Sequence, residues 1–457
     1  MKIVVTGATG FIGKAAVIHL ARLGHEITAI VRKEGSASDL PCKSFVWDSS
    51  SEDASSLTPA LNATEAVIHL AGEPVANSRW TTETKEAIRT SRVDGTRKLI
   101  EAVSKLLPVD RPKLIVSGSA IGIYGDRGNE EITELTSAGP LARDKNEFLA
   151  SVTFAWESEA QKAEALGVRV VRLRTGIVLG RDGGALQKMQ PVVLGDGKQW
   201  MSWIHLEDEV RFIAFALTNQ EISGAYNLTS PSPVRNSEFT KKLAKARRFP
   251  FVVSTPKFVL KAVLGEMSTV LFASCKALPN RAVEQGFQFT YPTLSLALDQ
   301  IYASGDPLEQ RMSVTQFVPK PVEEVFDFFS KAENLEEITP PFLNFQISSK
   351  STQAISENTL INYRLKIHGV PAKWQSKIER WVPNVEFVDT QIKGPYAKWH
   401  HTHRFEKVSG GTLVSDDVIY KVPGGRMGKA LLSAFIRRDV TQIFAYRKKK
   451  IAEVFKS

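Results

Sequence analysis

Apolar and polar positions follow two different patterns over the first 33 residues of the chain. A short apolar run at 2–5 predicts a buried strand, and apolar spacing of three and four residues over 12–23 predicts a helix. A second apolar run at 27–31 predicts another strand. Gly24 stands between them, where a helix end favours a residue that accepts positive φ. The pattern is a strand–helix–strand unit with a glycine-rich turn after its first strand.

The same alternation continues through the first half of the chain. Further strands are predicted at 45–48, 66–72 and 114–119, and helices at 83–92 and, after a break at 93–96, up to 107. Alternating strands and helices build a parallel sheet with helices on both faces, and ligands bind at the carboxyl ends of its strands. We therefore predict an α/β fold, a Rossmann-type doubly wound parallel sheet, over residues 1–303. A short C-terminal segment, 248–303, completes it.

The alternation of strands and helices ends at a stretch with Gly and Pro at 304–309, which we predict to be a linker. A strand and two helices come first, six extended segments follow, and a long helix ends the chain. These elements are 310–317, 319–332 and 334–338, then 345–351, 359–368, 372–382, 385–393, 398–408 and 412–422, then 428–455. Extended segments broken by Gly and Pro predict an antiparallel meander. We predict an α+β domain over 310–457.

Composition and charge narrow the class of protein. A chain of 457 residues calls for two or three domains, and two cysteines exclude a disulfide framework and fit a reducing compartment. The net charge of +10 is scattered apart from 447–450, which argues against a nucleic-acid partner. No apolar run approaches the ~20 residues of a membrane span, and no signal peptide precedes the first strand. We expect a cytoplasmic protein, and its oligomeric state stays open.

The glycine-rich turn reads Thr6-Gly7-Ala8-Thr9-Gly10-Phe11-Ile12-Gly13. A diphosphate approaches the backbone only where no side chain intervenes. The following helix start offers unpaired N–H groups and the positive end of its dipole to such an anion. The sequence therefore predicts a dinucleotide site, and the alternative is a tight turn that binds nothing.

The end of the second strand indicates which dinucleotide binds. An Asp or Glu at this point would bind the ribose 2′-hydroxyl of NAD. This chain carries Arg32 and Lys33 instead. Cations suit a 2′-phosphate, since an arginine offers two parallel donors to phosphate oxygens. NADP is therefore favoured over NAD, and the alternative is an ordinary solvated basic pair.

Thr6-Gly7-x-x-Gly10-x-x-Gly13 resembles the extended short-chain dehydrogenase/reductase superfamily, which includes NAD(P)-dependent epimerases and dehydratases. Motifs at 70–73, 79–80, 91–96, 117–126, 156–157, 173–180 and 199–208 narrow this resemblance. They are similar to an atypical epimerase-like group, some of whose members are called cell division inhibitors. The resemblance covers residues 1–303 and implies an NAD(P)-binding protein with a small-molecule substrate.

The resemblance and the strand ends together predict the residues of the site. Cofactor contacts are predicted at Gly7, Thr9, Gly10, Phe11, Ile12, Gly13, Arg32, Lys33, Asp48, Leu70, Ala71, Gly72 and Glu73. Substrate contacts are predicted at Arg79, Trp80, Arg92, Trp200 and Trp203. We assign His69 to packing and His205 to structure, and Asp208 is placed to cap a helix.

Hydride transfer at a C–OH group needs a residue that takes or gives the hydroxyl proton. The superfamily uses Tyr-x-x-x-Lys, yet the segment 145–157, where the pair should stand, contains no tyrosine. Ser119 and Tyr124 are the remaining catalytic candidates, and their alternatives are a strand-end hydroxyl and a packed aromatic ring. Two functions stay open: an NADP-dependent oxidoreductase or epimerase, and a nucleotide-binding sensor or regulator without turnover.

The order of elements over 309–457 resembles the START-like helix-grip fold of the polyketide cyclase/dehydrase and lipid-transport (SRPBCC) superfamily. This resemblance implies a cavity for a small hydrophobic ligand. His401 and His403 share one face of a predicted strand, as metal ligands would. No third ligand is evident in the sequence, so we predict a polar strand face and no metal site.

Overall fold

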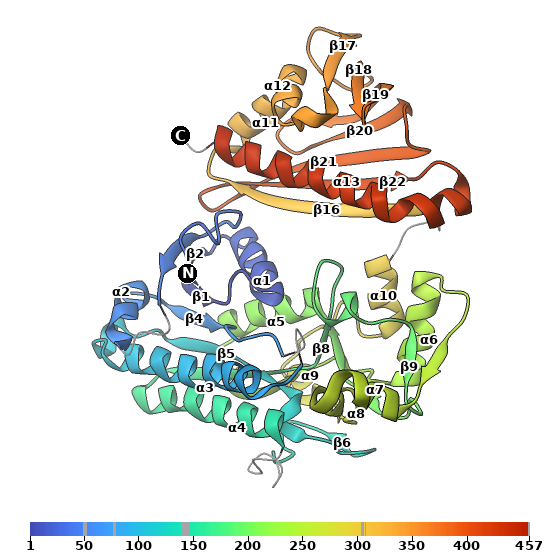
Figure 1. Ribbon diagram of the computed structural model, residues 1–457. Helices are drawn as coiled ribbons and strands as arrows, with labels where there is room; N and C mark the ends of the chain where they lie inside the picture. The colour runs from blue at the N-terminus through green and yellow to red at the C-terminus, as the bar shows by residue number, and fades with distance from the viewer. Residues whose placement is uncertain (49–52, 76–78, 139–146, 303–305, 307, 456–457) are drawn as a thin grey trace. The chain divides into compact units, whose positions relative to one another are not determined.

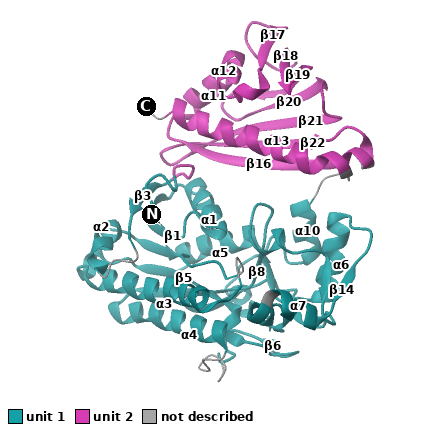
Figure 2. Ribbon diagram, in the orientation of Figure 1, with its two compact units in different colours: residues 1–37, 42–303 teal, residues 38–41, 304–457 magenta. Residues whose placement is uncertain are grey.

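The computed structural model describes residues 1–48, 53–75, 79–138, 147–302, 306 and 308–455. The chain forms two compact units, residues 1–37 with 42–303 and residues 38–41 with 304–457 (Figure 2). The predicted linker at 304–309 lies partly outside the described residues. Within the described part of the chain, no helix combines the length and the apolar character that crossing a membrane requires.

The first unit is built on a seven-stranded parallel sheet in the order β12-β7-β5-β4-β1-β2-β3. Its strands are β1 (Lys2–Thr6), β2 (Glu26–Val31), β3 (Lys43–Val46), β4 (Ala66–His69), β5 (Leu114–Ala120), β7 (Arg169–Thr175) and β12 (Gly224–Leu228). The chain winds outward in both directions from the β1–β4 neighbours, which makes this pair the switch point of the sheet. The structure confirms the predicted Rossmann-type fold, and ligands bind at switch points of such sheets.

Helices cover both faces of this sheet (Figure 1). Helix α1 (Phe11–Arg22) lies beside α5 (Leu206–Thr218), and α3 (Thr82–Ser104) lies beside α4 (Phe148–Gln161). The predicted break at 93–96 is wrong, since α3 runs through it without interruption. A single Gly95 costs a helix only about 1 kcal/mol, and burial of Val93 and Leu99 on one face offsets it.

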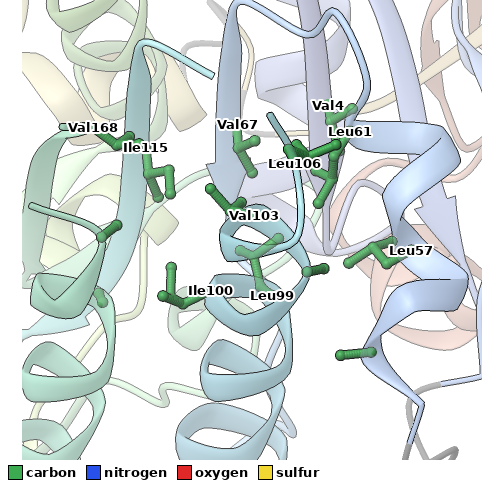
Figure 3. Packing of buried hydrophobic residues seen from close by; sticks show 14 of the residues in the cluster. Val4, Leu57, Leu61, Val67, Leu99, Ile100, Val103, Leu106, Ile115 and Val168 are labelled. Atoms are coloured by element: carbon green, nitrogen blue, oxygen red, sulfur yellow. The ribbon is translucent and has the colours of Figure 1, made fainter. Parts of the chain in front are cut away.

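Packing of α3 against the sheet forms the main core of the first unit. Figure 3 shows Leu99, Ile100 and Val103 of α3 facing Val67 of β4 and Ile115 of β5. All five side chains are at most 6% exposed. The apolar face of α3 thus packs on the apolar strands, as the sequence pattern predicts. The polar residues at the strand ends lie outside this core.

Shorter elements complete the first unit around the sheet. The strands are β6 (Glu131–Ile132), β8 (Ile177–Leu179), β9 (Val192–Leu194), β10 (Trp200–Met201), β11 (Trp203–His205), β13 (Val234–Arg235), β14 (Val253–Thr255) and β15 (Lys276–Ala277). The helices are α2 (Thr58–Leu61), α6 (Asn236–Arg247), α7 (Lys257–Leu264), α8 (Ser268–Phe272), α9 (Asn280–Glu284) and α10 (Leu294–Tyr302). The short strands form two-stranded pairs.

The second unit is a seven-stranded antiparallel sheet in the order β16-β22-β21-β20-β19-β18-β17. Its strands are β16 (Glu309–Val318), β17 (Gln346–Lys350), β18 (Leu360–Ile367), β19 (Val370–Val382), β20 (Glu386–Lys393), β21 (Lys398–Val408) and β22 (Gly411–Lys421). Its helices are α11 (Val322–Ser330), α12 (Ala332–Glu337) and α13 (Gly425–Val454). Each corresponds to a predicted element, so the structure confirms the antiparallel meander.

The long helix α13 packs along this sheet. Val440 and Phe444 contact Trp399, Val418 and Tyr420 in one cluster. Nearer its C-terminus, Ile451 joins a second cluster with residues of α11, β20, β21 and β22. A curved sheet that holds one long helix is the helix-grip arrangement predicted from the order of elements.

Candidate functional site

The glycine-rich turn connects β1 to α1 and touches the end of β4. Gly7 has φ of +72°, and a Cβ added there would lie 2.6 Å from the carbonyl carbon of Leu70. A Cβ on Gly13 would overlap the carbonyl oxygen of Gly7. Close backbone packing therefore explains these two glycines, and it brings the turn against the Leu70–Ala71 peptide.

The start of α1 is open to a ligand. Gly10 is the N-cap residue, and it has no side chain that could accept a hydrogen bond from the first amides of the helix. Thr9 and Gly10 are exposed, and the amides of Phe11 and Ile12 follow them. Amides without a cap at the positive end of a 12-residue helix are favourably placed to donate to an anion. The turn thus has the donors that a diphosphate needs.

Phe11 has a second role that the sequence did not indicate. Its ring packs on a glycine-rich loop that follows β8. A Cβ added to Gly180 or Gly184 would lie 2.7 or 2.6 Å from a ring carbon, and one on Gly183 would overlap the ring. The side chain therefore ties the start of α1 to this loop, while the amide remains part of the helix start.

Arg32 and Lys33 follow directly after β2, which neighbours β1 in the sheet. Both are exposed, and neither makes an ion pair with any described residue. Asp48, two residues after β3, is exposed as well. These three residues therefore stand at the carboxyl ends of β2 and β3, on the side of the sheet that holds the glycine turn.

Arg92 of α3 contacts the segment that follows β4, at Gly72 and Glu73. The Arg92 Nη1 donates to the carbonyl oxygen of Glu73 at 2.8 Å, and its guanidinium carbon lies 5.3 Å from the Trp156 ring. A Cβ on Gly72 would lie 3.0 Å from that guanidinium carbon. Burial lowers the pKa of Arg92 to about 10, which leaves it charged at neutral pH. Arg92 thus supports the backbone of the predicted cofactor segment.

His69, at the end of β4, is a packed residue as predicted. Its Nδ1 lies 2.7 Å from the Thr6 hydroxyl, and its Nε2 lies 2.9 Å from the Thr96 hydroxyl. Burial lowers its pKa to about 4, so the ring is neutral at pH 7.

Ser119, at the end of β5, belongs to a buried polar network. Its hydroxyl donates to Glu157 Oε1 at 2.6 Å. Arg174 of β7 donates to both Glu157 oxygens, at 2.8 and 3.0 Å. Burial alone would raise the pKa of Glu157, but the hydrogen bonds and charge of Arg174, the Ser119 hydroxyl and Arg172 outweigh it and lower the pKa. Glu157 is therefore an ionised acceptor behind Ser119.

Tyr124 is placed at the other side of Arg174. Its hydroxyl accepts from Arg174 Nη1 at 2.8 Å and donates to Asn227 Oδ1 at 2.8 Å. The ring is fully buried, and burial raises the pKa of the phenol to about 12. Its oxygen is thus neutral and engaged on two sides by protein groups.

Sequence reasoning missed Glu157, Arg174 and Asn227 as partners of the two candidates. The signal available for them was a charged residue within an otherwise apolar helix face or strand. Such residues are almost never fully buried unless they are paired. Arg174 in β7 and Glu157 in α4 both meet that description.

The predicted substrate residues are not brought into one cluster. Arg79 donates to the carbonyl oxygens of Val263 and Ala262 in α7, at 2.9 and 3.2 Å. The Trp80 ring lies 5.2 Å from Phe148, at the start of α4. Arg79 therefore lies against α7, and Trp80 lies against the start of α4.

Trp200 and Trp203 have different environments. The Trp200 ring is partly exposed and lies 4.5 Å from the Arg235 guanidinium carbon and 4.8 Å from Lys276 Nζ. Trp203 is 0% exposed and donates to the carbonyl oxygen of Ser232 at 3.1 Å. Trp203 is therefore a core residue with no surface for a ligand.

The prediction that Asp208 caps α5 is wrong. The N-cap is His205, whose ring accepts from the Glu207 amide at 3.2 Å. Asp208 is fully buried and accepts from the amides of Thr290 and Tyr291, at 2.7 and 2.9 Å. Both residues are structural, as expected, but Asp208 anchors a distant segment instead of the helix start.

The second unit contains a cavity of about 190 Å³. Most of its wall is aromatic or aliphatic, with residues from β18, β19, α12 and α13. One part of the wall is polar and includes Asp389, His401, His403 and Arg447. The third partner that the sequence did not reveal for the histidine pair is therefore Asp389, which lies across from it on β20.

Three stretches of the chain match described protein families. Residues 3–229 match the NAD dependent epimerase/dehydratase family, and residues 318–445 match the polyketide cyclase/dehydrase and lipid transport family. Residues 255–301 match a domain of unknown function, DUF1731. An epimerase family protein of Bacillus subtilis (strain 168), YfhF, is 34% identical over 309 residues, which are 66% of this chain and 98% of that protein.

Other relatives cover the same part of the chain. The chloroplastic SDR39U1 homolog of Arabidopsis thaliana is 38% identical over 66% of this chain and 86% of its own. A crystal structure of human epimerase family protein SDR39U1 (isoform 2) with NADPH matches with a TM-score of 0.57 and 27% identity, over 66% of this chain and 100% of that one. A crystal structure of the nucleoside-diphosphate sugar epimerase from Corynebacterium glutamicum matches with a TM-score of 0.52 and 31% identity, over 66% of this chain and 59% of that one.

Proposed function

Because the chain belongs to the NAD-dependent epimerase/dehydratase family, we propose that it is an NADP(H)-binding oxidoreductase or epimerase that acts on a small molecule. The observation that carries the proposal is the uncapped start of α1, with Thr9 and Gly10 exposed at the switch point of the sheet. Amides there bind the diphosphate, and Gly7 and Gly13 keep the turn close to β4.

The choice of NADP rests on Arg32 and Lys33. Both are exposed cations without ion-pair partners among the described residues, at the end of β2. A 2′-phosphate would supply the missing anion, and Asp48 would lie toward the adenine side. The human relative whose structure contains NADPH supports this choice.

Ser119 is the group we assign to the substrate oxygen. The cofactor supplies or accepts a hydride at the substrate carbon when it is bound. Glu157 takes the hydrogen bond from the Ser119 hydroxyl, so the serine oxygen keeps its lone pairs free to accept a hydrogen bond from a substrate hydroxyl. Tyr124, whose oxygen is held by Arg174 and Asn227, acts as a positioning residue for this network.

A nucleotide titration tests the cofactor assignment. NADPH and NADH are added to the purified chain, and quenching of tryptophan fluorescence is followed. We expect Arg32→Ala to weaken NADPH binding by about tenfold, a loss of about 1.4 kcal/mol, and to leave NADH binding unchanged. Lys113→Ala is the matched control, because Lys113 is an exposed cation at the amino end of β5 and Arg32 follows the carboxyl end of β2. Failure of both nucleotides to bind, or an equal loss for both in Arg32→Ala, contradicts the proposal.

A second candidate function is nucleotide binding without turnover, as in a sensor or regulator. The absence of a tyrosine from 145–157 favours it, although 145 and 146 lie outside the described residues. A rise in NADPH absorbance when NADP is mixed with a panel of hydroxyl compounds separates the two candidates. Turnover that falls in Ser119→Ala supports an enzyme, while tight NADPH binding with no turnover in any member of the panel supports a sensor.

The second unit matches a family that includes lipid transport, and we propose that its cavity binds a small hydrophobic ligand. An apolar dye that fluoresces in dry sites is the probe. Ile443→Lys places a charge on a cavity-lining position of α13 and should abolish the signal. Met427→Lys changes a residue of the same helix that is 74% exposed, and it should leave the signal intact. Equal signals in both variants would exclude this cavity as the site.

A further inference from the structure

Two buried histidines stand together on the cavity face of β21. The rings of His401 and His403 have centroids 3.7 Å apart, and their side chains are 5% and 4% exposed. Asp389 of β20 and Asp416 of β22 flank them on either side. Asp389 and the two imidazoles thus share one wall of a mostly apolar cavity, and Asp416 contacts the two rings.

Asp416 fixes the tautomer of His401. Its Oδ1 lies 2.9 Å from His401 Nε2, and because a carboxylate oxygen only accepts hydrogen bonds, Nε2 carries the N–H group and Nδ1 keeps its lone pair. His403 is held differently, since Arg447 Nη2 donates to its Nδ1 at 3.2 Å and leaves the N–H group of a neutral ring on Nε2. Asp416 Oδ1 lies 2.8 Å from His403 Nδ1, close enough to accept a proton there when Nε2 binds an ion instead.

Asp416 also lies 3.5 Å from Arg447 Nη2, on the side of the rings away from Asp389. A carboxylate that contacts the imidazole rings from this side is the support that histidine metal ligands have in proteins.

The other nitrogen of each ring faces Asp389. His401 Nδ1 lies 3.4 Å from Asp389 Oδ2, and His403 Nε2 lies 3.1 Å from the same oxygen. One oxygen of Asp389 and one nitrogen of each ring thus converge, and an ion among them would replace the proton that His403 Nε2 shares with Asp389. Ligands about 2.1 Å from a tetrahedral ion are about 3.4 Å from one another, which agrees with both separations.

We propose that Asp389, His401 and His403 bind a divalent transition-metal ion, with Zn²⁺ as the best match. Two imidazoles and one carboxylate are three protein ligands of the kind that leave a fourth position open. That position faces the cavity, since all three residues line it. The cavity ligand would then be an apolar molecule with an oxygen donor at one end.

Charge favours an anionic oxygen on that molecule. Asp389 and Asp416 are balanced in part by Arg447, so the cluster with neutral histidines carries one net negative charge. A divalent ion changes this to one net positive charge, and a carboxylate or enolate oxygen in the open position would neutralise the site. The metal would thus select for a polar end group that the apolar walls cannot recognise.

The experiment measures metal binding by the full chain after removal of bound ions with a chelator. Zn²⁺ affinity is measured by competition with a fluorescent chelator, and Co²⁺ is added as a spectroscopic probe. We expect one ion per chain and a Co²⁺ absorption band typical of four or five nitrogen and oxygen ligands. Asp389→Asn and His403→Gln should each weaken Zn²⁺ binding by 100-fold or more, and Asp416→Asn by about 10- to 100-fold.

His400→Gln is the matched control, because His400 is the neighbouring residue and lies on the opposite face of β21. It should keep the affinity of the unchanged chain. A Zn²⁺-dependent rise in the thermal unfolding temperature of the unchanged chain is a readout that does not depend on any variant folding. Absence of a bound ion, or unchanged affinity in both Asp389→Asn and His403→Gln, overturns the proposal and leaves a proton as the cation in the cluster. NADPH binding by the first unit, measured on the same samples, keeps this outcome separate from the proposed function.

Discussion

The Ser119 hydroxyl and the Glu157 carboxylate meet at 2.6 Å, although 38 positions separate them in the chain. One residue ends the strand β5 and the other stands in the middle of α4. Their contact places an ionised acid next to the serine, near the carboxyl end of β5. The proton of Ser119 is therefore directed toward Glu157.

Substitution of Glu157 should destabilise the first unit. Glu157→Gln leaves the buried Arg174 charge without its carboxylate, and removing one partner of a buried pair costs about 3 kcal/mol. Urea unfolding followed by tryptophan fluorescence measures this cost. Glu164→Gln, an exposed position just after α4, should change the free energy of unfolding by no more than about 0.5 kcal/mol.

The pH dependence of that cost has a defined sign. The pKa of Glu157 is lower in the folded protein than in the unfolded chain, so its stabilising contribution is present above the unfolded value of about 4.3. It is lost as the pH falls through the folded pKa. The difference between the unchanged chain and Glu157→Gln should therefore shrink below pH 4, and a difference that grows on acidification would contradict this assignment.

Glu209 in α5 should show the opposite behaviour. It is fully buried, its Oε2 has no hydrogen-bond partner among the described residues, and burial raises its pKa to about 8 against the opposing hydrogen bond from Thr175. Between pH 4.5 and 8 the unfolded chain is ionised at this site and the folded protein is not, so stability falls as pH rises. As the pH rises from 4.5 to 7, the free energy of unfolding of Glu209→Gln should therefore increase by about 3 kcal/mol relative to that of the unchanged chain.

The measurement for Glu209 is the free energy of unfolding at a series of pH values. Glu221→Gln, an exposed glutamate in the loop after α5, is the control and should follow the unchanged chain throughout. Parallel curves for Glu209→Gln and the unchanged chain would mean that Glu209 is ionised in the folded protein.

Two glycines should respond very differently to replacement by alanine. Gly13→Ala would force a Cβ into the carbonyl oxygen of Gly7, and such overpacking costs about 3 kcal/mol. Gly24 has φ of +82° with no atom within 4 Å of an added Cβ, so Gly24→Ala should cost only about 1 kcal/mol. Thermal unfolding compares them, and NADPH binding should be lost in Gly13→Ala alone. Equal costs would contradict the packing assigned to the turn.

Ser119→Ala and Tyr124→Phe should have different effects, the first mainly on turnover and the second mainly on stability. Tyr124→Phe removes the hydroxyl that accepts from Arg174 Nη1 and donates to Asn227 Oδ1, so we expect a loss of stability of about 2 kcal/mol with NADPH affinity unchanged. Ser119→Ala should lower turnover, where turnover is found, by at least about 100-fold with a smaller loss of stability. Unchanged turnover in Ser119→Ala would remove that residue from the proposed chemistry.

Local pattern was enough to predict most elements of both units. The strand predicted at 398–408 has the same bounds as β21, because alternation and flanking Gly and Pro are properties of the segment itself. The break predicted in α3 failed because a glycine inside a long amphipathic helix is offset by tertiary packing around it.

Contacts between distant segments could not be read from the sequence. Ser119, Glu157, Arg174, Tyr124 and Asn227 come from different elements, and only the folded sheet brings them together. The partner of the histidine pair depends on register, since Asp389 stands opposite His401 in the β20–β21 ladder. A shift of one residue would have turned Asp389 to the other face of the sheet.

The ring of Phe11 shares its space with Gly180, Gly183 and Gly184. The first residue of α1 and the loop after β8 are therefore constrained together, and the effects of substitutions in them cannot be additive. A larger side chain in the loop requires a smaller one at position 11. Redesign of the glycine-rich turn must therefore change both segments at once.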